Sequence, residues 1–143
     1  MMCDDFYDNN SVGDKWQAHM TELSSGDVSK TMFGNLHEYQ EAAFLLFQIN
    51  SNNQDQWGNI NWAVWEIFDP GINPGSGNEK EVAFWLNMAQ TTDLSRIDFS
   101  GVEILTPDQH GYQEFLYNTP EPGTLMLLGS GLIGVWMMRR YQA

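Results

Sequence analysis

Cys3 is the sole cysteine among 143 residues, and its thiol is the most reactive side chain that the sequence offers. A lone cysteine excludes an internal disulfide framework and a four-cysteine metal site. Two interpretations stay open for this residue. It is either a small buried hydrophobe next to a sheet or a nucleophile whose thiolate forms a covalent bond.

Acidic and amide side chains crowd the segment that follows Cys3, and their oxygens are the hard ligands that calcium prefers. They are Asp4, Asp5, Asp8, Asn9, Asn10 and Asp14. Their spacing does not match the EF-hand loop, and the glutamate that completes such a loop is missing. We therefore expect solvated turn acids here and no metal site.

Two further motifs lack a residue that their chemistry needs. The segment 37–41 begins like the zinc-binding HExxH helix, but Glu41 stands where the second histidine belongs. The Gly-Ser-Gly segment 75–77 lacks the Lys-Ser/Thr of a phosphate-binding loop. No spacing marks a pair of hydrolytic carboxylates or a Ser/His/Asp set. The sequence thus predicts a protein that is not an enzyme and that holds no metal or cofactor.

Tryptophans offer a different chemistry, because an indole ring can stack on a sugar ring, although at helical spacing it more often fills a core. Trp57, Trp62, Trp65 and Trp85 fall near helical spacing. We expect them mainly in the core, with a carbohydrate-binding platform as the alternative.

The elements that position these residues predict an α+β fold with short antiparallel strands flanking a three-helix middle. Strand-like stretches occupy 1–7, 15–23, 101–105 and 113–117, and in the second Ala18 and Met20 alternate with polar residues. Helical spacing of apolar residues predicts helices over 38–48, 55–68 and 79–90. Turn-forming residues fill 8–14, and Asp69-Pro70-Gly71 ends the second helix.

Charge divides the chain into two parts. The net charge is -13, and residues 1–119 hold 18 of the 19 acids and four of the six basic residues, a balance of -14. Residues 120–143 carry Glu121, Arg139 and Arg140, a balance of +1. A surface this acidic repels phosphate and excludes nucleic acid as the main partner.

The second part contains an apolar run, Gly123–Met138, in which no residue is charged. Its 16 residues would span roughly 24 Å as a helix, slightly less than the ~30 Å of a bilayer core. The basic pair Arg139-Arg140 follows it and favours a cytoplasmic end. We therefore predict a single transmembrane helix over 123–138, with residues 1–119 outside the cytoplasm. A buried C-terminal helix is the alternative.

Three elements of this tail occur in a fixed order: Pro120-Glu121-Pro122, the apolar run, and Arg139-Arg140. In that order they resemble the PEP-CTERM sorting signal, so we divide the chain into an ectodomain, 1–119, and a sorting signal, 120–143. The resemblance implies export by a Gram-negative bacterium, with the membrane and an exosortase as partners. It also implies residence in the inner membrane as a single-pass protein, or release to the cell surface or medium after processing.

An exported protein needs an N-terminal signal with basic residues and an apolar stretch, and the opening Met1-Met2-Cys3-Asp4-Asp5 has neither. We therefore expect the natural chain to begin earlier. The alternative is that the C-terminal helix alone directs insertion.

A second, more distant resemblance rests on segments 3–6, 39–44 and 61–70 together with Trp16. These segments are similar to the thioester domains of bacterial surface adhesins. In that family a cysteine on an early strand condenses with a glutamine and forms an electrophilic internal thioester. Cys3 matches the cysteine, but the glutamine position holds Asn61, whose side chain is one methylene shorter.

Together these observations predict an exported, membrane-anchored surface or extracellular-matrix protein that is not catalytic. Exopolysaccharide or another cell surface is its expected environment. Two alternatives remain: a covalent adhesin that uses Cys3 and Asn61, and a carbohydrate-binding module.

Overall fold

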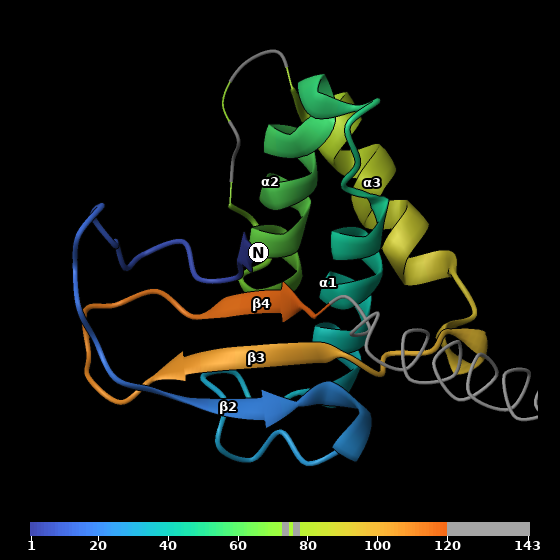
Figure 1. Cartoon of the computed structure of the whole chain (residues 1–143). Coiled ribbons are helices and arrows are strands. Elements are labelled where there is room, and N and C mark those ends of the chain that lie inside the picture. The colour runs from blue at the N-terminus through green and yellow to red at the C-terminus, as the bar shows by residue number, and fades with distance from the viewer. Residues whose placement is uncertain (73–74, 76–77, 120–143) are drawn as a thin grey trace, which may run out of the picture.

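The computed structural model describes residues 1–72, 75 and 78–119 (Figure 1). In this part the fold is α+β, with four strands in one antiparallel sheet and three α-helices. The strands are β1 (Met2–Cys3), β2 (Ala18–Glu22), β3 (Val102–Pro107) and β4 (Phe115–Asn118). The helices are α1 (Leu36–Gln48), α2 (Trp57–Phe68) and α3 (Glu79–Thr91). Short 3-10 turns occupy Leu23–Ser25, Gln54–Gln56 and Leu94–Arg96. The predicted α+β class and the order of its elements are confirmed.

The helices begin and end where local chemistry favours it. At the start of α1 the Asn35 side chain accepts a hydrogen bond from the His37 backbone N–H at 3.1 Å, which satisfies an otherwise unpaired donor. Helix α3 begins with Glu79 and Glu81 in its first turn, where carboxylates interact favourably with the helix dipole. These signals explain why the predicted helix boundaries differ from the observed ones by only a few residues.

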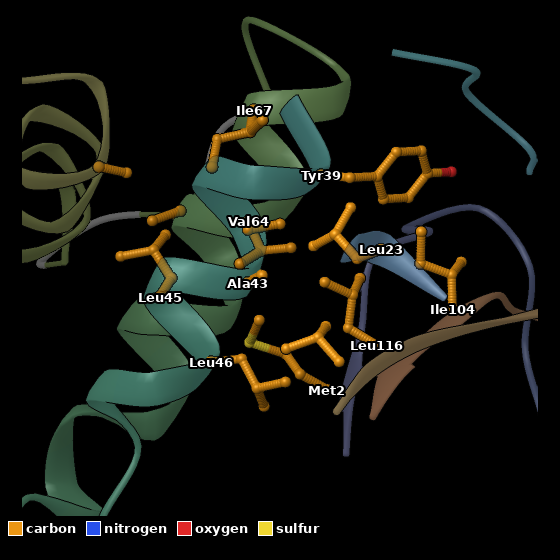
Figure 2. Close-up of a cluster of buried hydrophobic side chains, with 14 of the residues drawn as sticks. Met2, Leu23, Tyr39, Ala43, Leu45, Leu46, Val64, Ile67, Ile104 and Leu116 are labelled. Atoms are coloured by element: carbon orange, nitrogen blue, oxygen red, sulfur yellow. The ribbon is translucent and has the colours of Figure 1, made fainter. Parts of the chain in front are cut away.

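The sheet has the strand order β1-β4-β3-β2, so the N-terminal strand pairs with the last strand of the described chain. The register aligns four buried residues across all four strands, and we call them the inner row. They are Met2, Leu116, Ile104 and Thr21. Figure 2 shows Met2 and Leu116 pointing toward the α1 face that carries Ala43 and Leu46, with Ile104 next to Leu23. This contact holds α1 against the sheet.

The alternation predicted for the second strand is wrong in direction. Ala18 and Met20 are exposed, and the buried residue of β2 is Thr21. Side chains alternate along a strand, so Ala18 and Met20 lie on the face of the sheet opposite the inner row, where an apolar side chain gains no core contact. Trp57 likewise lies at the exposed start of α2 and not in the core.

In the part of the chain that the structure describes, no helix is long and apolar enough to cross a bilayer. The predicted transmembrane helix, 123–138, lies outside the described residues, as does the whole of 120–143. The single-pass prediction therefore stays a prediction.

Candidate functional site

A row of polar side chains lies beside the inner row, on the same face of the sheet. Side chains in a strand alternate with a period of two, so a residue two positions from an inner-row residue faces the same way. This places Asp4, Glu114, Thr106 and His19 next to one another in that order. The Asp4 backbone N–H donates to the Glu114 carbonyl at 3.3 Å, which extends the β1–β4 pairing by this step. Strand register thus brings two carboxyl groups together beneath the helices.

Glu114 is completely buried and well supplied with donors. One carboxylate oxygen accepts from the Tyr39 hydroxyl, which comes from α1. The other accepts from the Thr106 hydroxyl and from the Met32 backbone N–H, the latter at 3.0 Å. A buried carboxylate is tolerated when several donors surround it, so Glu114 joins β4, β3, α1 and the loop before α1.

Asp4 is almost as deeply buried, at 1% exposure, but no donor of a described residue makes a hydrogen bond of good geometry to either of its side-chain oxygens. Burial raises the pKa of Asp4 well above its ordinary value. The charge of the neighbouring Glu114 carboxylate, and the contact through which a protonated Asp4 donates toward it, raise the pKa further. Like charges this close cannot both be accommodated in a dry interior. Asp4 is therefore neutral in the folded protein over a pH range in which an exposed aspartate is ionised.

A pocket of about 180 Å³ opens beside Asp4, between the N-terminal segment and α2. Five aromatic side chains line it: Phe6, Tyr7, Phe33, Trp65 and Phe68. Phe33 stacks on Phe68 with ring centroids 4.4 Å apart, and Phe6 meets Trp65 edge to face at 5.2 Å. These contacts hold the rings as fixed walls.

Two more carboxylates belong to the pocket wall, Asp5 and Asp69. The Tyr7 hydroxyl donates to Asp69 Oδ2 at 2.6 Å and ties the N-terminal segment to the end of α2. Asp5 Oδ1 accepts from the Tyr7 backbone N–H at 3.0 Å, whereas Asp5 Oδ2 is buried without a partner among the described residues. Burial raises the pKa of Asp5 as well.

The prediction that Asp4 and Asp5 are solvated turn acids is wrong, because these residues directly follow β1 and continue along the sheet into the interior. Asp14 does behave as a turn acid, since its Oδ2 accepts from the Ser11 N–H at 2.7 Å. Across residues 1–72, 75 and 78–119, no cluster of three or more His, Cys, Asp or Glu side chains is arranged to hold a metal ion. In the HExxH-like segment, His37 Nε2 lies 3.5 Å from Glu41 Oε1 as an ordinary helical pair.

Cys3, the predicted thioester cysteine, lies on β1, and its thiol donates to the Asp5 carbonyl at 2.9 Å. The Trp65 indole N–H approaches the same sulfur and favours the thiolate, although it makes no hydrogen bond of good geometry to a described residue. Asn61 lies one helical turn before Trp65 on α2. No hydrogen bond joins Cys3 to Asn61 among the described residues, and the thioester stays a prediction.

Burial raises the pKa of the Cys3 thiol to about 12, and the carboxylates of Asp4 and Asp5 add to the rise. We expect iodoacetamide to alkylate native Cys3 at pH 8 on the order of a hundredfold to a thousandfold more slowly than an exposed thiol, because the thiolate is the nucleophile. Labelling is followed by mass spectrometry, and denaturation should restore the full rate. The control is Ser11→Cys, which adds a thiol on an exposed turn.

The same spectra test the thioester. An intact mass lower by one ammonia, with Cys3 resistant to alkylation even after denaturation until methylamine is added, would establish that bond. The full mass with slow labelling supports the buried thiol. Rapid labelling of native Cys3 would contradict both.

The four tryptophans of the predicted platform do not lie together on an open surface. Trp57 is 41% exposed and donates to the Asn50 carbonyl at 3.0 Å, whereas Trp62, Trp65 and Trp85 are half-buried. Trp62 meets Trp65 edge to face with centroids 4.9 Å apart, next to Phe6. The carbohydrate-binding module therefore stays a prediction.

Comparison with known proteins identifies one feature. The PEP-CTERM protein-sorting motif matches residues 118–140, which contain the predicted sorting residues Pro120, Glu121, Pro122, Arg139 and Arg140. The resemblance of the tail to this signal is confirmed. No curated protein and no solved structure matches the chain, and nothing in these comparisons supports the resemblance to thioester domains.

Sequence reasoning did not find Glu114 and Tyr39 as partners. Glu114 lies two residues before an inner-row leucine, and Asp4 lies two residues after an inner-row methionine. Each therefore shares the buried face of its strand. That spacing was a usable signal for burial, but the pairing of the first strand with the last was needed to bring the two acids together.

Proposed function

We propose that this chain is an exported protein sorted by an exosortase, in which residues 120–143 are the sorting signal and residues 1–119 are a non-catalytic cargo domain. The match of the PEP-CTERM motif to residues 118–140 carries the proposal. The cargo acts at the cell surface or in an exopolysaccharide matrix, anchored through the apolar run 123–138 until the tail is processed.

The end of the described fold supports this division. Strand β4 ends at Asn118, and the next residue, Thr119, is the last with described hydrogen bonds. Its backbone N–H and its hydroxyl both donate to the Gly101 carbonyl at 2.8 Å. The described sheet thus ends directly before the motif Pro120-Glu121-Pro122 in the sequence, and that motif lies outside the described residues.

Processing is tested by expressing the full chain with a secretion leader in a Gram-negative host, with and without an exosortase. We expect a shortened product only when the exosortase is present. Glu121→Ala should abolish or strongly reduce that product, because the enzyme must recognise the Pro-Glu-Pro segment. Immunoblots of membrane and medium fractions measure both the size and the location.

The matched control is Asp55→Ala, which removes one acidic charge from an exposed site far from the tail in sequence. Its processing should equal that of the wild type. Equal processing of Glu121→Ala and wild type, or shortening without an exosortase, would contradict the proposed sorting.

A further inference from the structure

The buried polar atoms that lack partners gather at one place. In the described residues they are Asp4 Oδ1, Asp4 Oδ2, Asp5 Oδ2 and Trp65 Nε1. All four belong to residues that line the 180 Å³ pocket. Buried polar groups are nearly always hydrogen-bonded, and each one that is not costs free energy. Three of the four are carboxylate oxygens, so the pocket mainly lacks donors.

No basic side chain of the described chain supplies those donors. The ion pairs of the described residues join His19 to Asp108, His37 to Glu41 and Arg96 to Asp93. None of them includes a pocket acid. The pocket is therefore acidic, and no described residue supplies it with a cation. It belongs to a part of the chain whose net charge of -14 attracts cations.

The aromatic side chains that line the pocket restrict the kind of cation that it can bind. Phe6 and Tyr7 are 38% and 72% exposed and form the outer part of the pocket, while Trp65 and Phe68 lie deeper. Aromatic faces attract organic cations through the ring quadrupole and also bury alkyl carbon. A hydrated metal ion uses neither property, and the described residues contain no metal-binding cluster.

We propose that this pocket binds a primary ammonium group carried on an unbranched alkyl chain, with the carboxyl group of Asp4 as its anchor and the aromatic rings of Phe6, Tyr7 and Trp65 around the chain. A primary ammonium brings a positive charge and three N–H donors to the unpartnered oxygens. Its positive charge favours the ionised form of Asp4, so binding releases the proton that Asp4 carries in the empty site. The alkyl chain fills the space between the rings. A lysine side chain and a free polyamine share this chemistry. This pocket belongs to the domain 1–119 and not to the sorting tail, so amine binding would be a further function of the chain in addition to its sorting.

The test is isothermal titration calorimetry of the full chain in a non-ionic detergent. n-Butylamine, protonated at pH 7, should bind saturably. The neutral isostere 1-butanol should not bind detectably, and tetramethylammonium, which has no N–H, should bind at least tenfold more weakly than n-butylamine. Two further ligands distinguish a polyamine from a lysine side chain. Tighter binding of putrescine would identify a polyamine as the ligand, and tighter binding of Nα-acetyl-lysine methylamide would identify a lysine side chain.

Three variants locate the site. Asp4→Asn should weaken n-butylamine binding at least about tenfold, because a hydrogen bond to a charged group is lost. Tyr7→Ala changes an exposed side chain and should fold normally, and loss of one ring should weaken binding about twofold to fivefold. The control Asp55→Asn removes the same charge at an exposed site and should leave binding unchanged.

Equal binding of n-butylamine and 1-butanol would overturn the proposal, as would unchanged affinity in both Asp4→Asn and Tyr7→Ala. Tighter binding of glucosamine than of n-butylamine would overturn the assignment to an alkyl chain. If Asp4→Asn does not fold, Tyr7→Ala decides the outcome.

Discussion

Asp4→Asn is expected to make the protein more stable at pH 7, by about 1 to 3 kcal/mol in the free energy of unfolding. In the unfolded chain Asp4 has an ordinary pKa near 3.8 and is ionised at neutral pH. In the folded protein burial and Glu114 raise the pKa of Asp4, so folding must take up a proton. Asparagine needs no proton, and its amide can donate toward the Glu114 carboxylate.

The same proton uptake makes the free energy of unfolding depend on pH, and the direction of that dependence can be worked out. The folded state binds more protons than the unfolded state wherever the pH lies between the two Asp4 pKa values. The contribution of Asp4 to stability is therefore fully present below about pH 3.8 and is lost as the pH rises toward the folded pKa. The slope for one proton is about -1.4 kcal/mol per pH unit. In Asp4→Asn this part of the slope disappears.

Urea unfolding of both proteins at several pH values between 5 and 8 measures the effect. Burial also raises the pKa values of Asp5 and Glu41, so the wild type and the variant share their contributions and the difference between the two proteins isolates Asp4. The exposed control Asp55→Asn should stay within about 0.5 kcal/mol of wild type at every pH. A pH slope equal to that of wild type in Asp4→Asn would show that Asp4 is ionised in the folded state.

Glu114→Ala is expected to have the opposite and larger effect, a loss of about 3 to 5 kcal/mol at pH 7. The substitution leaves two buried donors, the hydroxyls of Tyr39 and Thr106, and the partly buried Met32 backbone N–H without their acceptor. Each unsatisfied buried group costs about 1 to 3 kcal/mol, and the relief of Asp4 offsets part of the total. Such a loss is a large share of the 5 to 15 kcal/mol typical of a domain.

Urea midpoints of Glu114→Ala, Tyr39→Phe and Thr106→Val test this interpretation. Tyr39→Phe and Thr106→Val each remove one donor and leave Glu114 with the others, so each should cost only about 1 kcal/mol. The matched control is Glu103→Ala, on the neighbouring strand β3 but only half-buried, with an expected loss below that of Glu114→Ala. A loss under 1 kcal/mol in Glu114→Ala would mean that the carboxylate does not organise the fold.

The predictions for Asp4→Asn and Glu114→Ala concern the same pair of neighbouring buried acids and have opposite signs. Glu114 is a buried acid with all the donors it needs, and Asp4 is a buried acid with none. A residue that weakens the fold and also lines a pocket is typical of a binding site, where stability is given up for function. A stabilised Asp4→Asn that loses amine binding would separate this role from a purely structural one.

Local features of the sequence determined the secondary structure and the tail. Helical spacing and turn residues predicted α1, α2 and α3 within a few residues, because an apolar helix face and its ends depend on neighbours three or four positions apart. The order of Pro120-Glu121-Pro122, the apolar run and Arg139-Arg140 identified the sorting motif at 118–140. A sorting signal of this kind is a contiguous stretch of residues, so the sequence alone is enough to identify it.

Only the tertiary structure decided which side chains meet. The pairing of β1 with β4 joins residues more than a hundred positions apart, and no local pattern contains that register. This pairing turned Asp4 from an expected surface acid into a buried partner of Glu114, and it placed Asp4 in the wall of an aromatic pocket. Burial and the electrostatics that follow from it depend on long-range contacts, which is why the sequence showed the acids but not the site.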